Sequence, residues 1–178
     1  MALQTVPGTI VFTDLVGFTE FTAANGDEAA LALVDAQEGF IREAVNGHGR
    51  IIKTLGDGLM LFFDDPCRAI QASLKMQEMV EAHHARAGLP LWMRIGVHHG
   101  HAMVRHDDLV GHDVNLAARV VDLAGPGEVL ATEAAVSQVR ERIKGVDFEE
   151  MGPMLMKGIP DPVMVYTAHT SQAQAIPA

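Results

Sequence analysis

Two apolar runs separated by a short polar turn form the most distinctive pattern in the chain. The runs cover residues 51–52 and 59–63, and Gly56-Asp57-Gly58 lies between them. Glycine accepts the positive φ values that tight turns need, and aspartate is common at the bend. The pattern therefore predicts a two-strand hairpin. The second run is apolar at every position, which places it in the middle of a buried sheet.

The rest of the chain alternates apolar and polar segments in the same readable way. We expect a first strand at residues 8–13, and a polar connection at residues 105–111. In the long helix at residues 27–45, which Asp27 is expected to cap, the 3.6-residue period predicts a buried face that includes Leu31 and Ile41. Gly88-Leu89-Pro90 predicts a break. The other predicted elements are helices at 18–23, 66–86, 112–123 and 133–139, and strands at 92–104, 128–131 and, as a pair, within 144–168.

This order predicts an α+β fold. It consists of a ferredoxin-like βαββαβ core and a C-terminal αβαβ-type extension, with helices packed on a mainly antiparallel sheet. A chain of 178 residues forms one domain with a substantial core. We expect an N-terminal segment at residues 1–7, the domain at residues 8–168, and a flexible tail at residues 169–178.

Charge and cysteine content narrow the function. The net charge is −10, which argues against a nucleic-acid polymer as partner. Cys67 is the only cysteine, so no intramolecular disulfide forms, as expected in a reducing compartment. No apolar run approaches the roughly 20 residues of a membrane span, and residues 1–7 lack a signal-peptide pattern. We therefore expect a cytoplasmic protein without a membrane segment.

Two aspartates follow apolar strands or turns. Asp57 by itself is most simply a turn-forming residue, but Asp14 ends another strand, and the two carboxylates meet if their strands are neighbours. Such a pair needs a cation, and its hard oxygen ligands suit Mg²⁺ or Mn²⁺. The amides after Asp14, at Gly17 and Phe18, open onto a helix N-terminus, which favours anions. A metal beside an anion site indicates a nucleoside triphosphate.

Other polar residues have both a chemical and a simpler interpretation. Asn115 and Arg119 share one helix face and suit a phosphate, although a solvated helix face is the commoner explanation for such a pair. Lys53 and Asp108 are a donor and an acceptor for a base edge, or simply a surface lysine and a loop aspartate.

Lys157, in a glycine-flanked turn, reads by itself as a surface lysine. His98, His99 and His101 form a cluster, but no cysteine or carboxylate lies close in sequence to complete a transition-metal site.

Three blocks of this sequence together resemble the signatures of class III nucleotidyl cyclases, of the actinobacterial soluble type. The blocks are residues 12–19 (FTDLVGFT), 53–58 (KTLGDG) and 111–119 (GHDVNLAAR). They occur in the order of that family, and the similarity runs from about residue 8 to residue 168. Residues 124–130 and Lys157-Gly158 extend it.

The resemblance implies roles for individual residues. Asp14, Asp57 and the backbone carbonyl of Leu15 match the ligands of two Mg²⁺ or Mn²⁺ ions per site. Lys53 and Asp108 match the pair that recognises adenine. Asn115 and Arg119 match the residues that hold the ribose and stabilise the pentavalent phosphorus, and Lys157 matches a lysine on the terminal phosphates.

The expected activity is adenylyl cyclase, which converts ATP to 3′,5′-cyclic AMP and pyrophosphate. The resemblance further implies a head-to-tail homodimer with sites at its interface. A guanylyl cyclase is the alternative enzyme, but it favours Glu at the position of Lys53, because guanine has the opposite polarity along that edge. A silent nucleotide-binding or dimerisation module is the alternative outside catalysis, although members of that kind usually lack a residue that this chain retains.

Overall fold

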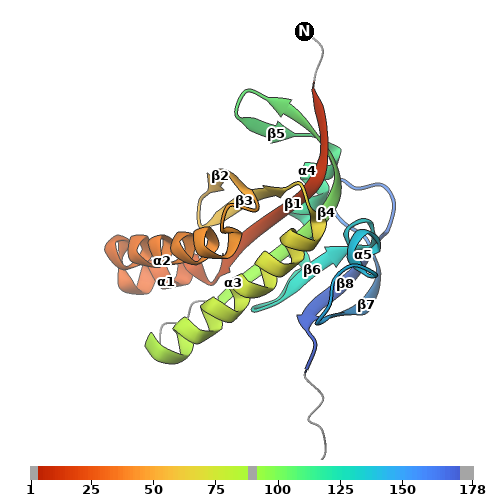
Figure 1. Cartoon of the computed structure of the whole chain (residues 1–178). Coiled ribbons are helices and arrows are strands. Elements are labelled where there is room, and N and C mark those ends of the chain that lie inside the picture. The colour runs from red at the N-terminus through yellow and green to blue at the C-terminus, as the bar shows by residue number, and fades with distance from the viewer. Residues whose placement is uncertain (1–3, 88–91, 173–178) are drawn as a thin grey trace, which may run out of the picture.

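An eight-stranded sheet forms the centre of this computed structural model, which describes residues 4–87 and 92–172 (Figure 1). The strand order is β2-β3-β1-β4-β6-β8-β7, and β5 pairs with β4. The strands are β1 (Thr5–Val16), β2 (Arg50–Leu55), β3 (Gly58–Phe63), β4 (Trp92–Arg105), β5 (Asp108–Val110), β6 (Val129–Thr132), β7 (Val146–Met154) and β8 (Val163–Thr170). The helices are α1 (Phe18–Asn25), α2 (Asp27–Val45), α3 (Pro66–Ala87), α4 (His112–Leu123) and α5 (Glu133–Val139).

The predicted fold class is confirmed. Elements β1 to β4, with α2 and α3, form the βαββαβ core, and all strand pairs are antiparallel except β4 with β6. The C-terminal extension continues through α4, β6 and α5, and it ends in the β7–β8 hairpin. The sequence pattern had indicated both of these last strands.

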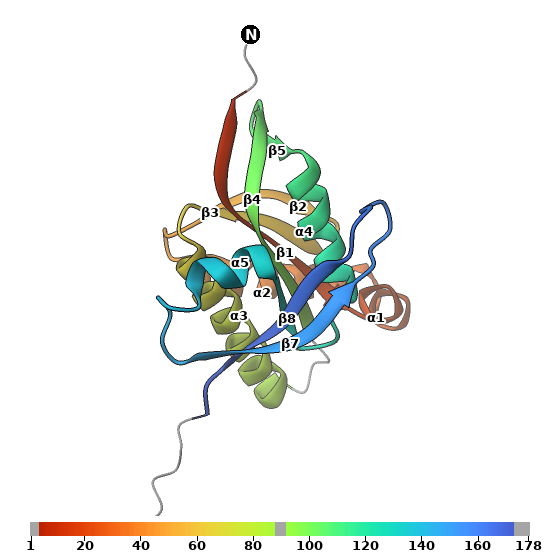
Figure 2. The ribbon, with the colours of Figure 1, turned by 90° about the vertical axis from the view of Figure 1, so that its right-hand side faces the viewer.

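Helices cover both faces of the sheet because the strand side chains alternate between two apolar cores. Val11 and Leu15 of β1 pack with residues of α2, α3 and α5 on one face. Ile10 and Phe12 point the other way and pack with Val114 of α4 and its neighbours. Figure 2 shows α4 on one side of the sheet, with α3 and α5 on the other. In the part of the chain that the structure describes, α4 is therefore the single helix that covers the face of the β1–β4 pair to which Ile10 and Phe12 point.

Several predicted boundaries were wrong. Residues 105–111 are not only a connection, because Asp108–Val110 form β5 against the end of β4. The sheet also extends past residues 8 and 168: β1 begins at Thr5, which pairs with Met103, and β8 ends at Thr170. The predicted break at residues 88–90 and most of the predicted tail lie outside the described residues.

The predicted buried face of α2 was partly wrong. Leu31 is 64% exposed, and the buried face instead includes Ala30, Leu33, Gln37 and Ile41. Asp27 does not cap this helix, since Gly26 occupies the N-cap position without a side-chain hydrogen bond. The face of the helix is thus rotated by about one residue at its first turn relative to the prediction.

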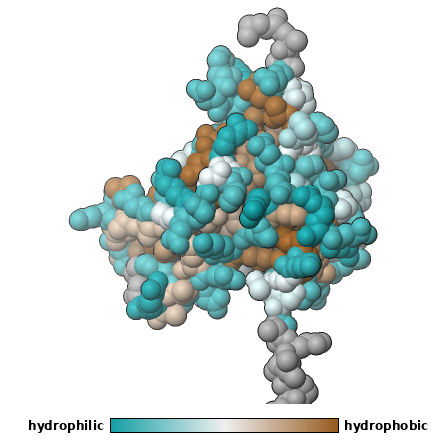
Figure 3. Space-filling view, in the orientation of Figure 1, coloured by the Kyte–Doolittle hydropathy of each residue, from teal (hydrophilic) through white to brown (hydrophobic). Residues whose placement is uncertain are grey.

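None of the helices within residues 4–87 and 92–172 combines the length and the apolarity of a membrane span. Hydrophilic side chains cover most of the face seen in Figure 3, and apolar residues occupy separate patches between them.

Candidate active site

The two strand-end aspartates come together because β3 runs alongside β1. Thr13 pairs with Leu59, and the Thr13 hydroxyl accepts a hydrogen bond from the Leu59 amide at 3.2 Å. A Cβ added to Gly58 would lie 2.3 Å from the Thr13 carbonyl oxygen, so only glycine lets the turn approach β1 this closely. The turn therefore holds Asp57 beside Asp14.

The electrostatics of Asp57 record this proximity. Burial, followed by the negative charge of Asp14, raises the pKa of the Asp57 carboxyl. Its own backbone amide and that of Leu15 oppose the shift by hydrogen bonding. Leu15 itself is buried, and its backbone lies at the carboxylate pair. Two adjacent carboxylates, one of which has a raised pKa because of the other's charge, form a site that favours a cation.

Arg94 is a further member of this site, and sequence reasoning missed it. It lies opposite Asp14 in the β1–β4 ladder. Its Nε donates to Asp14 Oδ2 at 2.8 Å, and Nη2 donates to the same oxygen. Both side chains are about one-quarter exposed, at 28% and 26%. A single charged residue in the apolar strand of residues 92–97 was the only local signal.

An open helix N-terminus follows Asp14. Gly17 precedes α1 with φ 72°, in the left-handed region that favours glycine, and no side chain caps the helix. The first backbone bond of the turn runs from the Phe21 amide to the Gly17 carbonyl at 2.9 Å. The amides of Phe18 and the next two residues thus have no intrahelical acceptor. The Phe18 side chain packs against the apolar core, so its backbone is the part available to a ligand.

Asn115 and Arg119 lie on the exposed side of α4, as their spacing predicts. Together with Asp14 they line a groove of about 290 Å³, which Leu55 of the hairpin also borders. Asp122 pairs with Arg119, with Oδ2 at 3.2 Å from Nη1, and its Oδ1 lies 4.0 Å from Arg94 Nη2.

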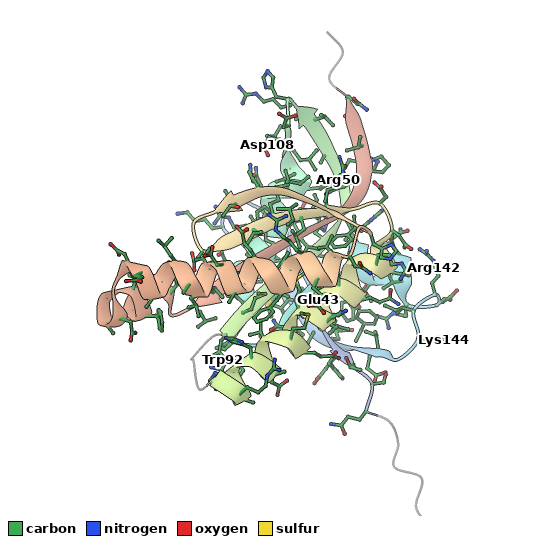
Figure 4. The ribbon with its side chains drawn as sticks, turned by 60° about the vertical axis from the view of Figure 1, so that its left-hand side comes forward. Glu43, Arg50, Trp92, Asp108, Arg142 and Lys144 are labelled. Atoms are coloured by element: carbon green, nitrogen blue, oxygen red, sulfur yellow. The ribbon has the colours of Figure 1, made fainter. Side chains whose placement is uncertain are left out.

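Lys53 and Asp108 form an ion pair between β2 and β5. Lys53 Nζ donates to Asp108 Oδ2 at 2.7 Å, and this hydrogen bond is the main reason why the pKa of Asp108 is lowered. Figure 4 shows Asp108 on the arm formed by β4 and β5. The pair lines a second cavity of about 400 Å³, together with Ile52 and residues 105–107.

Lys157 stands apart from these groups. It is exposed in the turn after β7, and within the described residues no hydrogen bond or ion pair joins it to the groove or to the second cavity. The histidine cluster is divided between the two faces of β4. His98 faces Asp113 of α4, whereas the His99 ring lies 2.9 Å from the Thr9 hydroxyl.

Comparison with solved structures agrees with this fold. The adenylyl cyclase CyaB from P. aeruginosa superposes with a TM-score of 0.81 at 25% sequence identity, over 97% of this chain and 98% of that chain. An adenylate cyclase from Trypanosoma brucei, solved in its monomeric state, gives 0.81 at 26% identity, over 91% of this chain and 89% of that chain. The fold is therefore that of nucleotide cyclase catalytic domains.

Sequence comparison gives the family. Residues 3–170 match the Adenylate and Guanylate cyclase catalytic domain. A pH-sensitive adenylate cyclase of Mycobacterium tuberculosis (strain CDC 1551 / Oshkosh) is 32% identical over 164 residues, which are 89% of this chain and 39% of that protein. The chain belongs to the adenylate and guanylate cyclase catalytic domain family, which confirms the resemblance seen in the three sequence blocks. It spans about two-fifths of the length of this relative.

Proposed function

We propose that this chain is an adenylyl cyclase that converts ATP to 3′,5′-cyclic AMP and pyrophosphate. Membership of the family leaves ATP and GTP as substrates, and the Lys53–Asp108 pair carries the choice between them. A lysine amine donates to adenine N1, and a carboxylate accepts from the N6 amino group. Guanine presents an acceptor at O6 and a proton on N1, so the same pair opposes it. The 2.7 Å contact holds both groups at one cavity, as a base-reading pair requires.

The carboxylate pair supports metal binding. Asp14, Asp57 and the Leu15 carbonyl would hold two Mg²⁺ or Mn²⁺ ions, which supply positive charge for the triphosphate and a lowered pKa for the 3′-hydroxyl. The raised pKa of Asp57 supports a cation at this pair, because a cation would relieve the repulsion between the two carboxylates that causes part of the pKa shift. The pairing of β1 with β3 is what brings these groups together.

The remaining residues position the nucleotide. The open amides at Gly17 and Phe18 suit phosphate oxygens, and Arg94 adds local positive charge to a chain whose net charge is −10. Asn115 would orient the ribose, and Arg119 would stabilise the charge that develops at the α-phosphorus. Lys157 is proposed on resemblance alone as a ligand of the terminal phosphates.

The proposed site is shared between two copies of the chain. Within one copy, Lys53 and Asp108 line a cavity separate from the groove that Asp14 shares with Asn115 and Arg119. The separation of Lys53 and Asp108 from the carboxylates supports a shared site, and the assignment of Asn115 and Arg119 to the other copy rests on the family resemblance. A head-to-tail homodimer brings the carboxylates of one copy to Lys53, Asp108, Asn115, Arg119 and Lys157 of the other, and so completes two equivalent sites. We place this dimer in the cytoplasm, as the single cysteine suggests.

Turnover of the two nucleotides tests the proposal. The protein is incubated with ATP or GTP, with Mn²⁺ or Mg²⁺, across a dilution series. We expect cyclic AMP from ATP, little cyclic GMP from GTP, and a specific activity that falls on dilution. Cyclic GMP as the main product would instead identify a guanylyl cyclase. Absence of both products, at high protein concentration and with both metals, would contradict the catalytic function.

A further inference from the structure

Helix α4 is fixed to β4 at two points, and one of them is polar. Near its C-terminal end the helix touches the strand backbone: a Cβ on Gly96 would lie 2.4 Å from the Val121 amide nitrogen. At its N-terminal turn the contact is Asp113, whose Oδ2 accepts a hydrogen bond from the His101 amide at 2.7 Å. Asn115 and Arg119 lie between these two points, so both contacts determine where these residues stand.

The space for Asp113 is provided by a glycine. Gly100 faces α4, and a Cβ at this position would lie 2.1 Å from Asp113 Oδ2 and 2.5 Å from its Cγ. No positive φ requires glycine there, because Gly100 lies within the regular ladder opposite Gly8. The close approach of the Asp113 carboxylate is therefore the reason that a side chain does not fit.

A buried histidine completes the contact. His98 is 5% exposed, and its Nδ1 lies 2.8 Å from the Thr132 hydroxyl. That hydroxyl oxygen also accepts from the Ala135 amide as the cap of α5, at 3.4 Å. The Thr132 hydroxyl can donate to Nδ1, and His98 Nε2 lies 3.5 Å from Asp113 Oδ1 without a hydrogen bond. His98 is thus bonded to Thr132 at the end of β6 and faces the first turn of α4 with its other ring nitrogen.

We propose that Asp113 is a positioning residue for the cyclase reaction. By accepting from His101 across Gly100 and facing His98, its carboxylate sets the first turn of α4, and through it the places of Asn115 and Arg119. This proposal rests on the proposed function, because it concerns the residues assigned to the ribose and the α-phosphorus. A displacement of about 1 Å in such groups lowers turnover by up to 100-fold without abolishing binding.

A simpler role for Asp113 is general stabilisation of the helix N-terminus by a negative charge. Asp113→Asn separates the two roles, since it removes the charge but keeps an oxygen for the His101 amide. Asp113→Ala removes both. Gly100→Ala keeps the carboxylate but displaces it. His112→Ala, at an exposed neighbour in the same turn, is the matched control.

The test measures kcat and KM for ATP in these variants, together with thermal stability. We expect kcat to fall at least about tenfold in Asp113→Ala and Gly100→Ala, with KM within about threefold of wild type. Asp113→Asn and His112→Ala keep kcat within about threefold. We expect the double variant Asp113→Ala/Gly100→Ala to lose no more kcat than either single variant, because both substitutions act through one contact. Wild-type kcat in a folded Asp113→Ala, or equal losses in the Asn and Ala variants, would overturn the proposal.

Hydrogen–deuterium exchange gives a readout that does not depend on activity. We expect faster exchange at residues 111–116 in Asp113→Ala and Gly100→Ala than in Asp113→Asn. Unchanged exchange in all three variants would overturn the proposal that Asp113 fixes the first turn of α4 to β4. If the wild-type protein forms no cyclic nucleotide but the expected exchange pattern is seen, the proposed function is wrong, while the role of Asp113 in fixing the first turn of α4 is supported.

Discussion

Arg94 and Asp14 lie directly opposite each other in the β1–β4 ladder, and the guanidinium donates two hydrogen bonds to one carboxylate oxygen. The arginine therefore offsets one of the two negative charges at this end of the sheet. The second carboxyl, that of Asp57, has a raised pKa and lies beside β1. One carboxylate of the pair thus has a guanidinium partner on the neighbouring strand, whereas the pKa of the other is raised by burial and by its neighbour.

Removing Arg94 should weaken both the fold and the binding of the triphosphate. Arg94→Ala leaves Asp14 and Asp57 without a compensating cation. We therefore expect the free energy of unfolding, measured without metal, to fall by roughly 1–2 kcal/mol. We also expect KM for ATP to rise. Urea unfolding and steady-state kinetics measure both effects. Arg86→Ala, on the exposed surface of α3, is the control, and an Arg94→Ala variant as stable as this control would contradict the role.

Asp57 should limit the stability of the metal-free protein. Its pKa is raised in the folded state, so the folded protein binds more protons than the unfolded chain as pH rises above 3.8. Its contribution to stability therefore falls as pH rises through this window. We expect Asp57→Asn to melt at a higher temperature than wild type at pH 7 without metal, with the difference shrinking toward pH 4. A lower melting temperature of Asp57→Asn at pH 7 would show that the carboxylate is stabilising.

The same substitution should remove function. Without the Asp57 carboxylate, we expect Mn²⁺ no longer to raise the melting temperature, and cyclic AMP formation to fall at least about a hundredfold. The control is Asp65→Asn, at a half-buried residue that pairs with Arg142 and does not line the groove. Retained metal-dependent turnover in Asp57→Asn would place the metal site elsewhere.

Arg119 should act on the transition state rather than on substrate binding. Arg119→Ala is expected to lower kcat by about 10²–10³, the scale of one lost oxyanion donor, and to leave KM within a few-fold. Arg142→Ala, which removes another exposed arginine, serves as the control. A normal kcat in Arg119→Ala would contradict the role.

Nucleotide choice should follow the Lys53–Asp108 pair. Lys53→Glu alone brings two carboxylates together, so we pair it with Asp108→Ser, which offers a hydroxyl to guanine O6. In this double variant we expect kcat/KM for ATP to fall at least about tenfold, and the ratio of GTP to ATP turnover to rise. Both products are quantified in the same assay. An unchanged ratio would mean that other residues read the base.

Local patterns predicted the parts of the site that are local. The turn at Gly56-Asp57-Gly58 and the spacing of Asn115 and Arg119 are set by neighbours in sequence, and the structure confirms the hairpin and the helix. Lys53 and Asp108 were grouped through the family resemblance, and the structure brings their side chains into contact. Their role in reading the base stays a prediction.

Arg94 was not predicted, because its meaning depends on the pairing register of β1 with β4, which no local pattern reveals. The contact of Asp113 was likewise not predicted, since its partner His101 lies on another strand. The error at Leu31 has a different origin. Several apolar residues compete for the face of α2, and tertiary packing chose Ala30 and Leu33.

Mixing two inactive variants tests the shared adenylyl cyclase site most directly. Asp57→Ala and Arg119→Ala proteins are each assayed alone and then mixed, and cyclic AMP is measured with ATP and Mn²⁺. If the carboxylates and Arg119 of one site come from different copies, random pairing restores about one quarter of wild-type activity, because half of the dimers carry one intact site. If the mixture stays as inactive as its components although dimers exchange, each site is built within one chain and the proposed assembly is wrong.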